Sequence, residues 1–279
     1  MAHIDKAPEP FEIIALKYAH LGNRHPGESF ILADPHEFGS DLDYFVWVLR
    51  RSDCTYLVDC GFAQEAATRR KRNLLRNPAD ALPLIGMDAS QVTDIILTHL
   101  HYDHAGNLQL FPRARFHLQE SEMAFATGRH MAHAFFAHAY DLEAVLSMVR
   151  LVYGAQVQFH HGDAEIVPGI TVHHVGGHTH GLQVVRVWTR LGWVVLASDA
   201  AHYLANMTTG RPFPIVADVM QMAAGWERLH ELASRPQYII PGHDPLVMQR
   251  YREPEPSLRG VAVRLDAEPQ GGLDGTVQR

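Results

Sequence analysis

The chain has 279 residues and a net charge of −7 with its histidines neutral; 47% of its residues are hydrophobic and 20% are charged. These proportions are those of an ordinary globular protein and exclude a disordered or fibrous chain. Neither a signal peptide nor an apolar run long enough to span a bilayer is present, so we expect a cytoplasmic protein with no membrane partner.

The first part of the chain, from about residue 11 to 60, is predicted to form short strands and loops. Runs 45–49 and 56–58 are rich in β-branched and aromatic side chains, and a polar turn separates them. Helical character follows over 64–77 and includes the densest basic cluster of the chain, at 69–72. We interpret this cluster as a solvated helix face, and therefore expect no nucleic-acid partner.

The two cysteines, Cys54 and Cys60, flank the predicted strand at 55–58. Residues at opposite ends of a strand lie too far apart to form a disulfide. We therefore expect two reduced thiols, as is usual in the cytosol.

The remainder of the chain alternates between strands and helices. A short apolar strand is predicted over 93–98, a mostly helical stretch over 120–152 and a helix over 218–234. Further strands are predicted over 115–118, 170–175, 183–188, 193–197 and 238–240.

This order of elements fits two packed sheets with helices on the outside. We expect one domain over residues 1–253. The proline, glycine and charged residues of 254–279 predict a loosely ordered C-terminal tail.

Histidine is unusually frequent, with 20 residues, and it is the commonest protein ligand for borderline metals. His99, His101, Asp103 and His104 follow the strand at 93–98 within six residues. In an extended segment, the spacing of His99 and His101 places both imidazoles on the same side. Four potential ligands in one loop are more than one ion needs from it, so the run predicts two adjacent metal ions.

Three later strand ends each present one further candidate ligand beside a small residue. His178 lies in the loop 176–181, Asp199 in 197–200 and His243 in 241–244. Loops on rigid strands are well suited to position a metal site. We therefore predict that these three residues join the cluster at 99–104.

Together and in this order, the His-x-His-x-Asp-His run and the loops Gly-Gly-His-Thr, Ser-Asp-Ala and Pro-Gly-His-Asp resemble the metallo-β-lactamase superfamily. The resemblance spans about residues 40–245, and the turn at 58–61 also resembles an upstream signature of that family. It implies an α/β fold, an αββα sandwich of two mixed β-sheets flanked by helices, with two divalent metal ions at one edge. The ligands implied are His99, His101 and His178 for the first ion, Asp103, His104 and His243 for the second, and Asp199 as the bridge.

Two such ions would lower the pKa of a bridging water, and the resulting hydroxide would attack a carbonyl or phosphoryl group that a metal polarises. Asp103 is the candidate for passing the proton to the leaving group. Zinc suits the histidine and carboxylate ligands best, and iron, manganese or cobalt would also be accepted.

Within the superfamily the chain resembles the quorum-quenching N-acyl-homoserine lactonases. Chain length, the full ligand set and the form His-Tyr-Asp-His-Ala-Gly-Asn of the central motif carry this resemblance. It implies hydrolysis of a small lactone or ester, and a homodimer would fit it. Those lactonases commonly carry a substrate-contacting tyrosine three residues after the bridging aspartate. Here that position is His202, so either His202 donates to the substrate or the adjacent Tyr203 turns into the site.

Two other functions stay open. A thioester hydrolase of the glyoxalase II type shares the ligand set but would carry a substantial helical extension after its last histidine. A non-catalytic metal-binding paralogue is disfavoured because a structural zinc needs only four closed ligands. The segment 129–140 is interpreted as an amphipathic helix or, alternatively, as the mouth of the pocket, and Phe213 is a candidate wall for an acyl chain.

Overall fold

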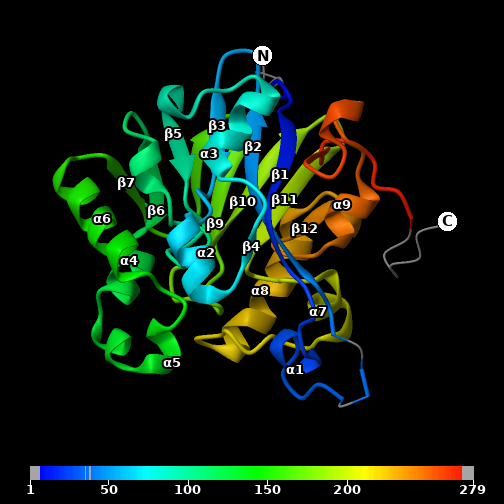
Figure 1. The fold of residues 1–279 in the computed structure, drawn as a ribbon. Coiled ribbons are helices and arrows are strands. Elements are labelled where there is room, and N and C mark those ends of the chain that lie inside the picture. The colour runs from blue at the N-terminus through cyan, green and yellow to red at the C-terminus, as the bar shows by residue number, and fades with distance from the viewer. Residues whose placement is uncertain (1–6, 35, 38, 272–279) are drawn as a thin grey trace, which may run out of the picture.

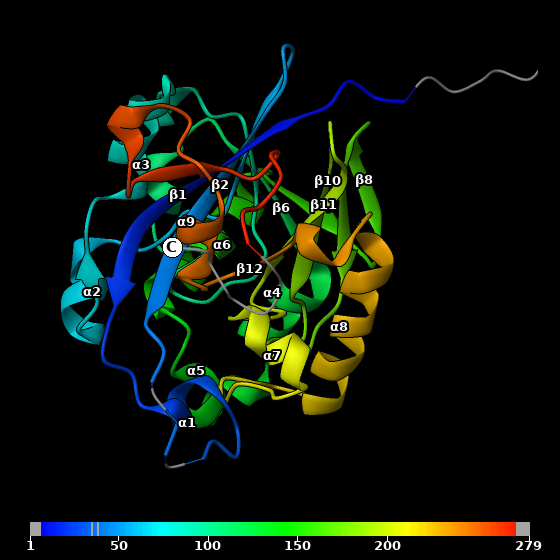
Figure 2. The same ribbon diagram turned by 90° about the vertical axis from the view of Figure 1, so that its right-hand side faces the viewer.

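The computed structural model describes residues 7–34, 36–37 and 39–271. Two β-sheets pack face to face, and helices cover both outer faces (Figure 1; Figure 2). The predicted α/β architecture of two mixed sheets flanked by helices is confirmed.

The first sheet has eight strands in the order β13-β1-β2-β3-β5-β6-β7, with β4 beside β1. Its pairs are antiparallel around β1 and β2 and parallel from β3 to β7. The strands are β1 (Glu12–Leu21), β2 (Leu42–Arg50), β3 (Thr55–Val58), β4 (Asn73–Leu74), β5 (Asp94–Ile96), β6 (Arg115–Gln119), β7 (Val157–His160) and β13 (Ala262–Arg264).

The second sheet has five strands in the order β12-β11-β10-β9-β8. Only the pair β11–β12 is parallel. The strands are β8 (Ala164–Val167), β9 (Ile170–His174), β10 (Gln183–Thr189), β11 (Gly192–Ser198) and β12 (Ile239–Pro241).

The core between the sheets follows from the alternation of side chains along each strand. In β1, Ile13 and Ala15 face the second sheet and join one apolar cluster with Val185 and Leu196. Leu16 on the same strand belongs to a different cluster, in which the outer helices pack. Both faces of β1 are therefore buried, which explains why its sequence is apolar rather than alternating.

The helices form the two outer layers. On the second sheet, α8 (Val219–Leu232) buries Met222, Trp226 and Leu229, whose spacing places them on one helix face. On the first sheet lie α2 (Gln64–Arg70), α3 (Pro78–Ala81), α4 (Glu120–Ala126) and α6 (Leu142–Tyr153). Shorter helices are α1 (Pro26–Ser29), α5 (Ala134–Ala137), α7 (Leu204–Thr209) and α9 (Leu246–Arg250), and 3₁₀ turns cover Leu82–Ile85, Ala89–Gln91, Leu108–Leu110, Arg129–Ala132, Pro236–Tyr238 and Pro256–Leu258.

Two predicted helices are shorter than expected. The helix predicted over 64–77 ends at Arg70, because Lys71 adopts a left-handed conformation with φ 55° and β4 follows. The helical stretch predicted over 120–152 is divided into α4, α5 and α6. Both cysteines are free, as predicted. Among the described residues, no helix combines the length and apolar character needed to cross a membrane.

The prediction of a loosely ordered tail over 254–279 is wrong for its first part. Strand β13 pairs with β1, and the backbone N–H of Leu265 donates to the carbonyl of Ile13 at 2.8 Å. Polar and proline-rich residues surround a short run, 261–265, that is apolar except for Arg264, and their composition concealed this edge strand. Residues 272–279 lie outside the described residues.

We expect Leu265→Ala to lower the free energy of unfolding by about 2–4 kcal/mol, because the side chain is buried in the inter-sheet core. Urea denaturation of the variant measures the change. Leu84→Ala, at a half-exposed position, is the control and should change it by less than about 0.5 kcal/mol. An unchanged stability in Leu265→Ala would mean that this segment does not pack as described.

Candidate metal centre

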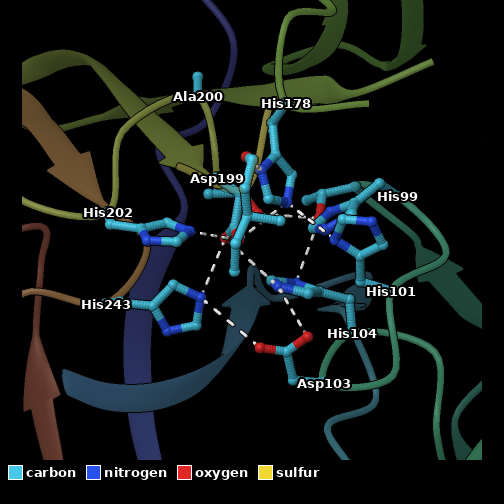
Figure 3. A network of polar contacts seen from close by, with 12 residues as sticks. His99, His101, Asp103, His104, His178, Asp199, Ala200, His202 and His243 are labelled. Carbon is cyan, nitrogen blue, oxygen red and sulfur yellow. Dashed lines mark hydrogen bonds and ion pairs between the residues drawn. The ribbon is translucent and has the colours of Figure 1, made fainter. Parts of the chain in front are cut away.

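The structure brings all seven predicted ligands together in one buried cluster (Figure 3). The loops after β5, β9, β11 and β12 supply them, so that ligands distant in sequence meet at one end of the sandwich. The residues are His99, His101, Asp103, His104, His178, Asp199 and His243.

Two of the groups that could hold a metal ion match the predicted ligand sets, and a third, His99, His104 and Asp199, overlaps both. The ligand atoms of each lie within 4.8 Å of one another. The first group is His99, His101 and His178, and the second is Asp103, His104 and His243.

Asp199 lies between the two groups. One of its oxygens, Oδ2, is 3.3 Å from Nε2 of His178, and the other, Oδ1, is 3.1 Å from Nε2 of His243. Each carboxylate oxygen therefore faces a different group, as a bridging ligand requires.

Several buried atoms of this cluster lack a hydrogen-bond partner among the described residues. They are Nε2 of His99, Nε2 of His104 and Oδ1 of Asp199. Buried polar atoms are almost always paired, so three such atoms that converge on one point need an explanation. Imidazole and carboxylate donors suit zinc and similar divalent ions, and the residues present therefore fit two such ions.

The electrostatics of the cluster favour a bound cation. Burial holds the pKa of His99 and of His101 well below the usual range, so both imidazoles are neutral and have a free lone pair. Burial also opposes the charged form of His104, but Asp199 and Asp59 outweigh it and raise the pKa of this histidine well above its usual range. The carboxylates thus create a negative potential that attracts positive charge.

Hydrogen bonds on the far side of three rings orient their Nε2 atoms toward the centre. Such partners fix the ring orientation and raise the basicity of a ligating histidine. The contacts from Nδ1 are 2.7 Å to Oδ2 of Asp59 for His104, 2.6 Å to the carbonyl of Ile215 for His178, and 2.8 Å to the carbonyl of Asp43 for His243.

Glu122 is a buried acid in the first turn of α4 that sequence reasoning missed. It accepts hydrogen bonds from the backbone N–H of Leu100 at 2.9 Å and of Gly181 at 3.1 Å, and from the hydroxyls of Thr179 at 2.6 Å and Tyr140 at 2.9 Å. Burial raises the pKa of Glu122, while these donors stabilise the charged form. One carboxylate therefore connects the loop of His99–His104 to the loop of His178, and nothing in the local sequence signals this.

His202 lines the same cavity as His101, Asp103 and His178. Its Nε2 lies 2.9 Å from Oδ2 of Asp199, and its ring stacks on Phe213 with centroids 3.5 Å apart. Burial lowers the pKa of His202 to about 3, so the ring is neutral and has a single N–H to donate. His202 also forms a possible ligand group with His178 and Asp199.

The alternative that Tyr203 turns into the site is wrong. Its buried hydroxyl lies 2.6 Å from Nη1 of Arg24 and 3.4 Å from Oγ of Ser29, and the residue does not line the metal cavity. Phe213 is fully buried behind His202, so it forms no exposed wall. Pro214 and Ile215 line the cavity in its place.

The segment 129–140 contains features of both interpretations made from the sequence. Phe136 packs on the core, and the ring of Tyr140 lies edge-on against His101 with centroids 4.6 Å apart. His138 lines the cavity, which has a volume of about 300 Å³. This volume is at the lower end of the range for small-molecule sites.

Residues 40–243 match the model of the metallo-beta-lactamase superfamily. An N-acyl homoserine lactonase of Bacillus sp is 25% identical over 220 residues, which cover 73% of this chain and 82% of the relative. A probable metallo-hydrolase of Mycobacterium tuberculosis is 26% identical over 238 residues, covering 75% of this chain and 73% of that protein. A solved quorum-quenching N-acyl homoserine lactone lactonase superposes with a TM-score of 0.72 at 22% identity, covering 86% of this chain and 95% of the other.

We expect Glu122→Gln to destabilise the protein by about 2–4 kcal/mol, because an amide removes one acceptor oxygen and turns its NH₂ toward buried donors. The affinity for zinc should fall about tenfold as the two ligand loops lose their connection. Urea unfolding and zinc titration against a competing chelator measure both effects. Glu120→Gln, at an exposed position in the same helix turn, is the control. Equal behaviour of the two variants would contradict the positioning role of Glu122.

Proposed function

We propose that this chain, which belongs to the metallo-β-lactamase superfamily, is a lactonase that opens the ester ring of an N-acyl-homoserine lactone or a related small lactone. The observation that carries the proposal is the position of Asp199 between two groups of ligands at the floor of a cavity of small-molecule size. Relatives named N-acyl homoserine lactonases, which match about three quarters of the chain, support it.

The reaction would use two divalent ions. His99, His101 and His178 would hold the first, Asp103, His104 and His243 the second, and Asp199 would contact both. When bound, the ions supply a water molecule of lowered pKa and polarise the ester carbonyl. Zinc suits these donors, and iron, manganese or cobalt are further candidates.

Asp103 is placed to handle the proton of the reaction. Its carboxylate lies at the cavity, with its oxygens 3.8 Å from Nε2 of His104 and 3.8 Å from Nε2 of His243. The hydroxyl of Tyr18 donates to the backbone carbonyl of Asp103 at 2.8 Å and fixes this turn. The carboxylate can accept a proton and deliver it to the alkoxide oxygen that leaves as the ring opens.

His202 orients Asp199 in this proposal. A neutral imidazole has one N–H, and here Nε2 faces the Asp199 carboxylate, while Nδ1 is buried without a partner among the described residues. No second N–H is available for a substrate carbonyl. The proposal therefore replaces the predicted contact of His202 with the substrate by a contact that holds the bridging carboxylate.

We expect the purified protein to contain two divalent ions per chain and to open acyl-homoserine lactones or simple γ- and δ-lactones. The measurement combines metal analysis with turnover of these lactones, S-lactoylglutathione, nitrocefin and a phosphodiester. Preferential cleavage of the thioester or the phosphodiester would reject the lactonase proposal while retaining the metal centre. Metal binding without turnover of any substrate would favour a non-catalytic paralogue.

The variant Asp103→Asn tests the proton-transfer role. We expect it to retain part of the metal content and to lose about 10²–10⁴-fold in kcat, because an amide cannot accept the proton. Steady-state kinetics and metal analysis on one preparation give both values. Asp53→Asn, which alters an exposed carboxylate paired with Arg51, is the control and should keep full activity. Full turnover by Asp103→Asn would refute the role.

A further inference from the structure

Three arginines, Arg24, Arg70 and Arg72, line the same cavity as the metal ligands. Within the described part of the chain, none of the three forms an ion pair, whereas Arg69 pairs with Asp141 and Arg211 pairs with Glu37. Partly buried cations without a counter-charge are unfavourable. None of these three guanidiniums has a carboxylate within ion-pair distance among the described residues, which points to an anionic ligand.

Arg70 and Arg72 are held in place around one aromatic ring, that of Tyr102. The guanidinium of Arg70 lies over the ring at 4.0 Å from its centroid, and Nε of Arg72 donates to the Tyr102 hydroxyl at 3.0 Å. Lys71, between them, has the left-handed conformation that ends α2, so both side chains reach the same ring. Two cationic groups are thus fixed around the ring of Tyr102, in the wall of the cavity that Asp103 also lines.

These contacts leave donors free. Nη2 of Arg70 donates to the carbonyl of Tyr140 at 3.0 Å. Nη1 of Arg72 donates to the carbonyl of Arg70 at 2.8 Å. Nε of Arg70 is buried with no partner among the described residues. Nη1 of Arg70 and Nη2 of Arg72 likewise donate to no described group, so each guanidinium retains an unused N–H.

Both terminal nitrogens of Arg24 are occupied by contacts within the protein, while its buried Nε has no partner among the described residues. Its Nη1 contacts the hydroxyls of Tyr203 and Ser29, and its Nη2 donates to the carbonyl of Glu28 at 2.6 Å. The Glu28 carboxylate is the one acidic group of the cavity wall, besides Asp103 and Asp199, among the described lining residues. Two divalent ions outweigh the charge of those two ligands, so the loaded cavity is electropositive.

We propose that Arg70 and Arg72 form an anion subsite, and that the substrate of this centre carries a carboxylate or phosphate group in addition to its ester bond. This inference rests on the proposed lactonase function and deepens it by naming the substrate class. Guanidinium groups match such oxyanions with paired, charge-assisted hydrogen bonds. A neutral acyl chain would desolvate the two cations without pairing them.

The alternative is that both arginines serve only to support Tyr102. That role uses the face of one guanidinium and one N–H of the other, and it is independent of the charge of the substrate. A pair of substrates that differ only in one terminal charge therefore separates the two roles.

The probes are N-glutaryl-homoserine lactone, which ends in a carboxylate, and its primary amide of the same length and shape. The wild-type protein, loaded with zinc, should open the carboxylate probe with a kcat/KM at least about tenfold higher than that of the amide, mainly through a lower KM. A third probe that ends in a phosphonate distinguishes the two kinds of anion, since the better substrate identifies the preferred group.

Arg70→Gln and Arg72→Gln should each lower kcat/KM for the carboxylate probe by about 10–100-fold, and the loss should exceed the loss on the amide by at least about tenfold. Arg70→Lys, which keeps the charge, should recover part of the kcat/KM for the carboxylate probe that Arg70→Gln loses. Arg69→Gln is the matched control, because this neighbour lies on the same helix, is mostly exposed and does not line the cavity. Metal content and thermal unfolding confirm that each variant is folded.

Equal kcat/KM for the carboxylate and amide probes, or equal losses on both in the variants, would overturn the anion subsite and leave the lactonase proposal intact. If no lactone is opened, the proposed function fails, and binding still tests the subsite. Calorimetry on the zinc-loaded protein should then show glutarate binding about tenfold more tightly than glutaramate, with the difference lost in Arg70→Gln. Equal affinities would reject the subsite.

Discussion

The burial of two carboxylates and five imidazoles at one point is the constraint on which the rest of the structure depends. Such a cluster is unfavourable without a cation for two reasons. Burial opposes the charged forms of these side chains, and nitrogen or oxygen atoms of His99, His104 and Asp199 have no hydrogen-bond partner among the described residues. The sandwich makes the cluster possible by delivering the ligands from the ends of strands in both sheets. The strands are packed on an apolar core and fix the positions of these loops, so the ligands are already close together in the folded chain.

Two buried acids outside the ligand set hold the loops that carry the candidate ligands. Asp59, at the end of β3, binds the imidazole of His104 and the backbone of Thr98, and Glu122 connects two ligand loops across the gap between the sheets. Each acid is fully buried and accepts several donors, which offsets its desolvation. The candidate metal centre is therefore part of a larger polar network, and its geometry depends on residues outside the set of candidate ligands.

The ligands were predictable from the sequence because each belongs to a local motif at the end of an apolar strand, and such motifs need no knowledge of distant contacts. Glu122 was not predictable, since its partners Leu100 and Thr179 are 22 and 57 residues away. The same reason explains the error over β13, where pairing with β1, more than 240 residues earlier, overrides a composition typical of a tail. The sequence left open whether His202 or Tyr203 contacts the substrate, and only the structure shows that Nε2 of His202 faces the Asp199 carboxylate.

Two parts of the cavity have different roles in the proposed function: the candidate metal ligands at its bottom, and the side chains of its wall, which determine which substrate is bound. In the proposed function, the candidate metal ligands at the bottom of the cavity would activate an ester bond, and they carry little information about the remainder of the substrate. Selection therefore falls to the wall, where Tyr203 is turned away and Phe213 lies behind His202. The groups that line this wall include aromatic rings, apolar side chains and cations: Tyr44, Tyr102, Leu21, Leu42, Ala139, Pro214, Ile215, His138, Arg24, Arg70 and Arg72. Under the proposed anion subsite, the guanidiniums beside Tyr102 select an anionic substrate over a neutral one of the same shape, because only an anion satisfies these cations.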